Sequence, residues 1–122
     1  MANDRMTKVS VMIPVYNQEK FIYDAINSAL NIKYDNLEIV VLDDFSSDNS
    51  YNIAKEFEKK SDKIKVYRND KNLGRKETYR RLLYELATGD WVIMLDGDDY
   101  FLETDFIKEA VDEINKNKKI VA

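Results

Sequence analysis

The chain of 122 residues is long enough for one compact domain and too short for two. Its hydrophobic fraction of 44% can build one core, and its 19 basic and 23 acidic residues leave a net charge of −4, which gives no attraction to nucleic acid or to an anionic membrane. The sequence has no Cys and no His, which excludes disulfides, thiolate nucleophiles and Ser-His-Asp catalysis. Any bound metal must therefore be a hard cation with oxygen ligands.

Short β-prone stretches alternate with helical patterns along the chain. Strands are predicted at residues 9–13, 37–42, 64–67 and 91–95, and helices at residues 21–30, 53–57, 79–86 and 107–114. The nearly continuous apolar runs at 37–42 and 91–95 predict strands that are buried on both faces, and Asn17 is expected to cap the first helix. This alternation predicts a single α/β domain over residues 1–122, with a mainly parallel sheet and helices on both faces.

The sequence contains no recognisable segment for targeting or for crossing a membrane. Its apolar runs, such as residues 91–95, are far shorter than the ~18 residues of a membrane span. Ser10 and Pro14 interrupt the first apolar stretch, so no secretory signal can be drawn there. We therefore expect a cytoplasmic protein.

The last three residues, Ile120-Val121-Ala122, are apolar and β-prone and directly follow a helical pattern. They predict the start of a fifth strand, so we expect the chain to be the N-terminal part of a longer domain, with a frayed natural terminus as the alternative. An incomplete sheet leaves an unpaired edge and an uncovered apolar face. We therefore expect the chain alone to self-associate and to lack a complete active site.

Polar side chains follow each of the four predicted strands. In an open parallel sheet the carboxyl ends of the strands lie at one edge, where ligands bind. These residues are Tyr16, Asn17 and Glu19 after the first strand, Asp43 and Asp44 after the second, Asn72, Gly74 and Arg75 after the third, and Asp96, Gly97 and Asp98 after the fourth. Adjacent carboxylates repel one another unless a cation or hydrogen-bond donors hold them. Two such clusters after buried strands predict one shared ligand site.

The two acidic clusters allow different interpretations. Asp96 and Asp98, on either side of Gly97, can share one octahedral cation that also binds phosphate oxygens of a substrate, and a loop that caps the next helix is the alternative. Asp43 lies where a doubly wound nucleotide-binding domain has the acid that bonds a ribose or a base. For Asp43 and Asp44 the alternative is a set of Asx turns and helix caps.

A basic cluster follows the third strand of this otherwise acidic chain. Its members are Arg68, Lys71, Arg75, Lys76, Arg80 and Arg81. Arg75 and Arg80 are the candidates for contact with a diphosphate, because a guanidinium matches phosphate oxygens in a bidentate manner. Lys71, Lys76 and Arg81 are interpreted as a solvated helix surface.

Five segments, taken together and in this order, resemble the family 2 glycosyltransferases of GT-A fold. They are Ser-Val-Met-Ile-Pro-Val-Tyr-Asn at 10–17, Glu-Ile-Val-Val-Leu-Asp-Asp-Phe-Ser-Ser-Asp at 38–48, Asn-Leu-Gly at 72–74, Ala-Thr-Gly-Asp at 87–90 and Leu-Asp-Gly-Asp-Asp at 95–99. Each segment alone is weakly specific, but the ordered set covers nearly all of the chain from Val9 onward. The resemblance implies a Rossmann-like GT-A half with strand order 3-2-1-4.

The resemblance also implies a function: inverting transfer from a nucleotide-diphosphate sugar, usually a UDP-sugar, to a carbohydrate or glycan acceptor, with Mg²⁺ or Mn²⁺. Asp98 would be the principal metal ligand, with Asp96 beside it on the ribose or sugar side. The backbone around Val15 and the carboxylate of Asp43 or Asp44 would contact the nucleoside. The family's catalytic base comes from the second half of the domain, so the catalytic residue is unknown for this chain. The full donor-binding set is expected to be Pro14, Val15, Tyr16, Asn17, Glu19, Asp43, Asp44, Asn72, Gly74, Arg75, Arg80, Asp96, Gly97 and Asp98.

Two loops depart from the family pattern. Between Gly74 and Gly89 the family commonly has Ala-Arg-Asn, and counting back from Gly89 gives Tyr79-Arg80-Arg81, in a segment that is one residue longer. The usual Asp-Asp-Gly-Ser turn reads Asp43-Asp44-Phe45-Ser46 here. We therefore expect a differently shaped loop after the second strand.

Three other functions fit parts of the same pattern. An oxidoreductase domain that binds a dinucleotide needs a Gly-rich turn after the first strand, and residues 14–19 contain no Gly. A phosphate-receiving signalling domain has its acid pair after the first strand, where this chain has Asn17. A non-catalytic module that only binds a nucleotide stays open as the alternative to the enzyme.

Overall fold

The computed structural model describes residues 7–98 and 110–113. Four strands form one sheet in the order β3-β2-β1-β4, and each neighbouring pair is parallel. The strands are β1 (Val9–Val15), β2 (Leu37–Asp43), β3 (Ile64–Arg68) and β4 (Trp91–Met94). The strand order implied by the family resemblance is confirmed.

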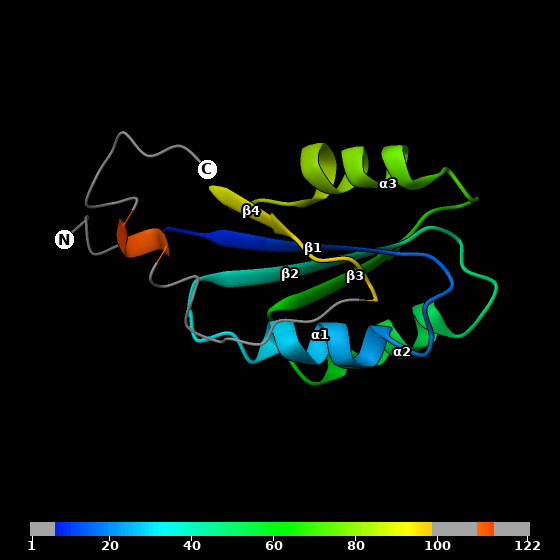
Figure 1. Ribbon diagram of the computed structural model, residues 1–122, viewed down its shortest axis with the longest axis horizontal. Coiled ribbons are helices and arrows are strands. Elements are labelled where there is room, and N and C mark those ends of the chain that lie inside the picture. The colour runs from blue at the N-terminus through cyan, green and yellow to red at the C-terminus, as the bar shows by residue number, and fades with distance from the viewer. Residues whose placement is uncertain (1–6, 99–109, 114–122) are drawn as a thin grey trace.

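Helices lie on both faces of the sheet (Figure 1). They are α1 (Ile22–Leu30) and α2 (Ser50–Glu56) with the 3₁₀ turn η2 (Phe57–Lys59), and on the other face α3 (Arg75–Arg81) with the π-helical turn η3 (Leu82–Leu86). Residues 110–113 are helical, while the rest of the helix predicted at 107–114 and the strand predicted from residue 120 lie outside the described residues. Within the described ranges, every helix is too short or too polar to cross a membrane.

Alternate residues of the central strands belong to two apolar cores, as strand geometry requires. Val11 and Ile13 of β1 pack in the core under α1 and α2, whereas Met12 packs in the core under η3. β2 is buried on both faces, as predicted. In β4 that prediction is wrong: Val92 and Met94 are 39% and 40% exposed, because η3 packs over β1 and β2.

The register of the parallel strands aligns their carboxyl ends. Val15 of β1 pairs with Asp43 of β2, which pairs with Arg68 of β3. Backbone hydrogen bonds continue this alignment past the strands, since Asp44 N donates to Val15 O at 2.8 Å and Asn69 N donates to Asp43 O at 2.8 Å. The polar segments after these strands therefore begin at the same edge of the sheet.

At the opposite end of the sheet, Glu38 fastens the turn that precedes β4. Its carboxylate accepts hydrogen bonds from Ser10 Oγ at 2.5 Å and from Thr88 N and Oγ1 at 2.6 and 3.0 Å, and Lys8 Nζ lies 3.6 Å away. Burial by itself raises the pKa of Glu38, but these hydrogen bonds and the charge of Lys8 outweigh it, so the pKa lies below its ordinary value of 4.5. The ionised form of Glu38 therefore stabilises the fold.

We expect Glu38→Gln to lower the free energy of unfolding by about 2 kcal/mol at pH 7, because partly buried donors lose a charged acceptor. Since folding lowers the pKa of Glu38, its contribution is complete above the unfolded value of 4.5 and disappears as the pH falls through the folded value. The stability gap between wild type and variant, measured by urea denaturation from pH 7 to pH 3, should therefore shrink in acid. The control Glu56→Gln removes only an exposed ion pair with Lys59 and should change little. A gap that stays constant down to pH 3 would contradict this role of Glu38.

Candidate functional site

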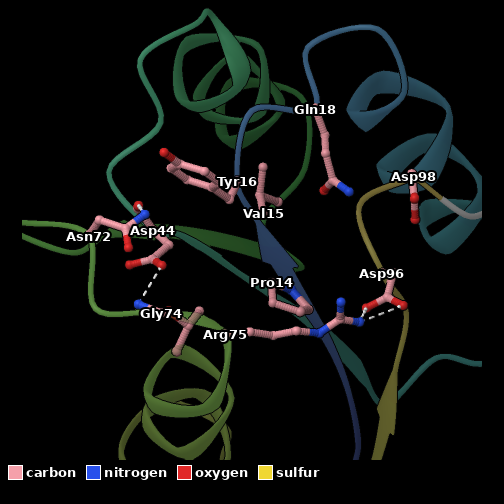
Figure 2. Close-up of a pocket in the computed structure, with 11 residues that line it drawn as sticks. Pro14, Val15, Tyr16, Gln18, Asp44, Asn72, Gly74, Arg75, Asp96 and Asp98 are labelled. Atoms are coloured by element: carbon pink, nitrogen blue, oxygen red, sulfur yellow. Dashed lines mark hydrogen bonds and ion pairs between the residues drawn. The ribbon is translucent and has the colours of Figure 1, made fainter.

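A pocket of about 350 Å³ opens at the carboxyl end of the sheet (Figure 2). Nine of the expected donor-binding residues line it, namely Pro14, Val15, Tyr16, Asp44, Asn72, Gly74, Arg75, Asp96 and Asp98, together with Gln18 and Thr78. Figure 2 shows a polar end, formed by Tyr16, Asp44 and Asn72, and an ionic end, formed by Arg75, Asp96 and Asp98. The segments that follow the four strands are thus brought to one site.

Asp44 is the buried acid of the polar end, with 4% of its surface exposed. Its Oδ1 accepts hydrogen bonds from Asn69 Nδ2 at 2.9 Å and from Leu73 N at 2.7 Å, and its Oδ2 accepts one from Gly74 N at 2.9 Å. A carboxylate has about four acceptor positions, so the contacts among described residues leave one position on Oδ2. Asp44 can therefore accept one further hydrogen bond from a ligand in the pocket.

At the ionic end, Arg75 reaches across the pocket to Asp96. Arg75 Nη2 lies 3.1 and 3.2 Å from the two carboxylate oxygens of Asp96. The two side chains are 80% and 42% exposed, and an exposed pair of this kind contributes only about 0–1 kcal/mol. The pair can therefore open at little cost when an anion approaches Arg75 or a cation approaches Asp96.

The side-chain oxygen of Gln18 is an unpaired hydrogen-bond acceptor, within the described residues, beside the turn after β4 that contains Asp96 and Asp98. Its Oε1 is buried and has no hydrogen-bond partner among the described residues. The same oxygen lies against Gly97, where an added Cβ would overlap it and would come within 3.3 Å of Val15 Cγ2. The absence of a side chain at Gly97 thus allows Gln18 and Val15 to lie close to its backbone, and Gly97 does not itself line the pocket. An unpaired oxygen against the turn that holds Asp96 and Asp98 is an environment that a cation would satisfy.

Asn17 and Glu19 fasten the loop after β1 to the loop after β2 and do not line the pocket. Asn17 has a φ of 52°, and its Oδ1 accepts a hydrogen bond from Ser47 N at 2.9 Å, while Glu19 Oε1 accepts one from Asn49 N at 2.9 Å. The prediction that Asn17 caps the first helix is wrong, because α1 has no side-chain cap and the carboxamide is engaged in this loop contact.

Asp43 is fully buried behind the pocket wall and does not line the pocket. Its carboxylate accepts hydrogen bonds from Ser46 N at 2.9 Å and Ser46 Oγ at 2.6 Å, and Arg68 Nε lies 3.5 Å away. Neighbouring residues of an extended strand point to opposite sides, so Asp43 and Asp44 cannot both face the pocket. Asp43 forms the turn contacts of the alternative interpretation, and Asp44 is the member of the pair that lines the pocket.

Arg80, expected at the diphosphate, lies away from the pocket. Its Nε is 3.9 Å from Glu77 Oε1, and its guanidinium lies 5.7 Å from the centre of the Tyr84 ring. The side chain is exposed on α3, one helical turn and a half past the residue that does reach the pocket, Arg75.

Sequence reasoning missed two lining residues, Gln18 and Thr78. Gln18 lies between Asn17 and Glu19, both selected as site residues, so its position after β1 was a usable signal. Thr78 precedes the buried Leu82 by four residues, a spacing that places both on the inner face of one helix.

Comparison with known proteins identifies the family of the chain. The chain matches the family described as Glycosyl transferase family 2 over residues 10–122. The chain belongs to glycosyltransferase family 2. It is 32% identical over 114 residues to poly(ribitol-phosphate) beta-N-acetylglucosaminyltransferase TarS of Staphylococcus aureus, and 33% identical over 95 residues to poly(ribitol-phosphate) beta-glucosyltransferase of Bacillus spizizenii. These matches cover 92% and 76% of this chain but 20% and 15% of the relatives.

Solved structures place this family 2 chain in the GT-A fold. The crystal structure of S. aureus TarS 1–349 in complex with UDP has a TM-score of 0.81 and 31% identity, and the match covers 91% of this chain and 33% of that one. The complex of the same protein with UDP-GlcNAc has a TM-score of 0.80 at 31% identity. A mannosyltransferase from Pyrobaculum calidifontis, at 23% identity and a TM-score of 0.80, supports the fold alone. The chain spans less than half the length of the relatives named here.

In this family 2 chain, Phe45 occupies the turn position after Asp44 where the family usually has glycine. Its φ is +63°, in the left-handed region that costs an L side chain about 1–2 kcal/mol. Its ring centre lies 5.1 Å from the Arg68 guanidinium, which also lies 5.0 Å from the centre of the Tyr51 ring. The stacking of Arg68 between two rings offsets the strain, so the turn that positions Asp44 is held by side-chain contacts.

We expect Phe45→Gly to be more stable than Phe45→Ala by about 1 kcal/mol, because both variants lose the stacking but only glycine relieves the left-handed strain. Urea denaturation of the two variants measures the difference. The matched pair at Asn52, an exposed position inside α2, should give the opposite sign, with alanine more stable than glycine by about 1 kcal/mol. If alanine is the more stable residue at position 45 as well, the strain is absent.

Proposed function

We propose that this chain is the donor-binding part of an inverting glycosyltransferase that uses a nucleotide-diphosphate sugar, with a uridine nucleotide as the donor. The observation that carries the proposal is the division of one pocket into a polar end and an ionic end. A nucleoside diphosphate has the same division, with a hydrogen-bonding base at one end and a polyanionic diphosphate at the other. The 31% identity to the TarS structure that contains UDP supports this choice of donor.

The polar end fits a base that offers one N–H group. The carboxylate of Asp44 only accepts hydrogen bonds when ionised, and its contacts within the described residues leave one position on Oδ2. Uracil presents N3–H, whereas cytosine presents a lone pair at the same position and would be repelled. Tyr16 lies beside Asp44 in Figure 2 and supplies an exposed ring against which a base can stack.

The ionic end fits a divalent cation together with a diphosphate. Asp98 and Asp96 provide hard oxygen ligands, and the orphaned Gln18 Oε1 adds a neutral oxygen close to Gly97. We propose Asp98 as the principal ligand of Mg²⁺ or Mn²⁺, with Asp96 beside it. A cation bound there supplies positive charge that stabilises the diphosphate as a leaving group.

Arg75 would supply the second positive charge at the ionic end. Its guanidinium is bonded to Asp96, and this exposed pair opens at small cost. A diphosphate is a better partner for the planar guanidinium, because two parallel hydrogen bonds can form to its oxygens. Arg75 would thus hold the leaving group, and the opening of the pair would free Asp96 for the metal or the sugar.

The acceptor is proposed to be a carbohydrate or glycan, and inversion requires a base that takes the proton of its hydroxyl group. Each carboxylate of the pocket wall already has a role in this proposal: Asp44 toward the base of the nucleotide, and Asp96 and Asp98 toward the metal. We therefore assign no catalytic base in this chain. Inversion is tested with the full-length protein, by the anomeric configuration of the transferred sugar in the NMR spectrum of the product.

We expect Mn²⁺ to raise the affinity for UDP by about tenfold or more, because the cation links the acidic turn to the diphosphate. Asp98→Asn should remove most of that increase, and isothermal calorimetry with Mn²⁺ and with EDTA measures it. Asp62→Asn is the matched control, since Asp62 is an exposed acid in the turn before β3, at the far end of the sheet. Equal affinity of the wild type for UDP with Mn²⁺ and with EDTA would contradict the metal site. Failure to bind UDP under either condition would contradict the nucleotide site itself.

A further inference from the structure

A buried carboxamide connects the outside of α3 to the carboxylate at the polar end of the pocket. Asn69, the residue after β3, is 1% exposed. Its Nδ2 donates to Asp44 Oδ1 at 2.9 Å and to Thr78 Oγ1 at 3.1 Å. Its Oδ1 accepts a hydrogen bond from Arg81 Nη1 at 2.7 Å. A continuous path of hydrogen bonds therefore runs from Arg81 through Asn69 to Asp44.

The chemistry of the two end groups sets the orientation of Asn69. An ionised carboxylate can only accept hydrogen bonds and a guanidinium can only donate them. The Nδ2 of Asn69 must therefore face Asp44, and its Oδ1 must face Arg81. Both hydrogens of Nδ2 are used, one by Asp44 and one by Thr78. A rotated carboxamide would lose its hydrogen bonds to both Asp44 and Arg81, whereas the Thr78 hydroxyl could still donate to it.

The orientation of Asn69 in turn defines which part of Asp44 is available to a ligand. Asn69 and Leu73 N occupy Oδ1, and Gly74 N occupies one position of Oδ2. Among the described contacts one position of Oδ2 is left, and Asp44 lines the pocket. A carboxylate that lost the bond from Asn69 could rotate and present a different oxygen, or accept from a different donor.

We propose that Arg81 is a positioning residue for nucleotide recognition, and that it acts on Asp44 through Asn69. The proposal rests on the proposed function, in which Asp44 contacts the base. Arg81 is the last residue of α3 and its side chain is 33% exposed, with Nε 3.4 Å from Glu85 Oε1 on the π turn. The guanidinium therefore spans from the helix surface to a fully buried carboxamide. The sequence pattern alone assigns it to a solvated surface.

If Arg81 has a purely structural role, a different result is expected. Loss of a structural contact lowers the stability of the fold and reduces the affinity for all nucleotides by the same factor. Loss of a positioning contact weakens the hydrogen bond from the base, so UDP loses affinity while CDP, whose ring has no N3–H to donate to Asp44, changes little. The ratio of the UDP and CDP dissociation constants therefore separates the two roles, and the increase due to Mn²⁺ at the other end of the pocket should be unaffected.

The experiment measures UDP and CDP binding by calorimetry, with and without Mn²⁺, for the wild type, Arg81→Met, Arg81→Lys and Lys76→Met. Lys76→Met removes one positive charge from an exposed position of the same helix and controls for the change in charge. We expect Arg81→Met to lower UDP affinity and the UDP preference over CDP by about tenfold. Arg81→Lys, which keeps a charged donor, should restore part of the preference, and Lys76→Met should equal the wild type.

Three outcomes would overturn the proposed relay, by which we mean the action of Arg81 on Asp44 through Asn69. If Arg81→Met retains the wild-type preference for UDP over CDP, Asp44 is positioned without Arg81. If affinity for both nucleotides falls by the same factor together with the melting temperature, the role of Arg81 is structural. If the wild type binds neither nucleotide, the proposed function fails and the relay with it. A wild type that prefers UDP, beside an unchanged Arg81 variant, leaves the proposed function intact and removes the relay alone.

Discussion

The carboxylate of Asp44 is the group on which the architecture of the pocket depends. A buried charge is costly unless hydrogen bonds satisfy it, and this one draws its donors from a single stretch of chain, residues 69–74. The segment between β3 and α3 is thereby fastened to the end of β2. Since α3 begins at Arg75, directly after this segment, the same hydrogen bonds place the guanidinium of the ionic end. The hydrogen bonds to Asp44 thus fix the position of the polar end of the pocket and also the position of Arg75 at the ionic end.

The neighbouring acid, Asp43, shows how strand geometry separates two residues of the same type. Asp43 ends β2 and points to the side where Ser46 and Arg68 lie, so its charge is used within the protein. Asp44 points to the other side and retains capacity for a ligand. One acid of the pair is therefore satisfied within the protein and the other lines the pocket, because neighbouring side chains of an extended strand point to opposite sides.

The fold could be predicted from the sequence because its determinants are periodic. Alternating strand and helix patterns lead to a parallel sheet, and the rule that ligands bind at the carboxyl ends of strands leads to most of the pocket. Local side-chain contacts could not be predicted in the same way. Asn17 and Glu19 turned toward the loop after β2, and Arg80 lies on the exposed side of α3, because short loops and helix rotation decide such contacts at the level of single residues. The exposure of β4 also depends on where α3 lies, which the strand pattern does not contain.

The π turn at Leu82–Leu86 bears on how this chain is aligned with its family. Ala87 N donates to Leu82 O at 2.8 Å, a bond that spans five residues where an α-helix spans four, so the helix holds one extra residue at this turn. The segment from Gly74 to Gly89 is longer than the family pattern by that same number. Before the turn, the count from Gly74 is therefore the valid one, and it places Thr78-Tyr79-Arg80 opposite Ala-Arg-Asn. Counting back from Gly89 instead assigns the arginine of the motif to Arg80, whose side chain is exposed. Counting from Gly74 places Tyr79 at that position, so this chain has a tyrosine where the family has the arginine.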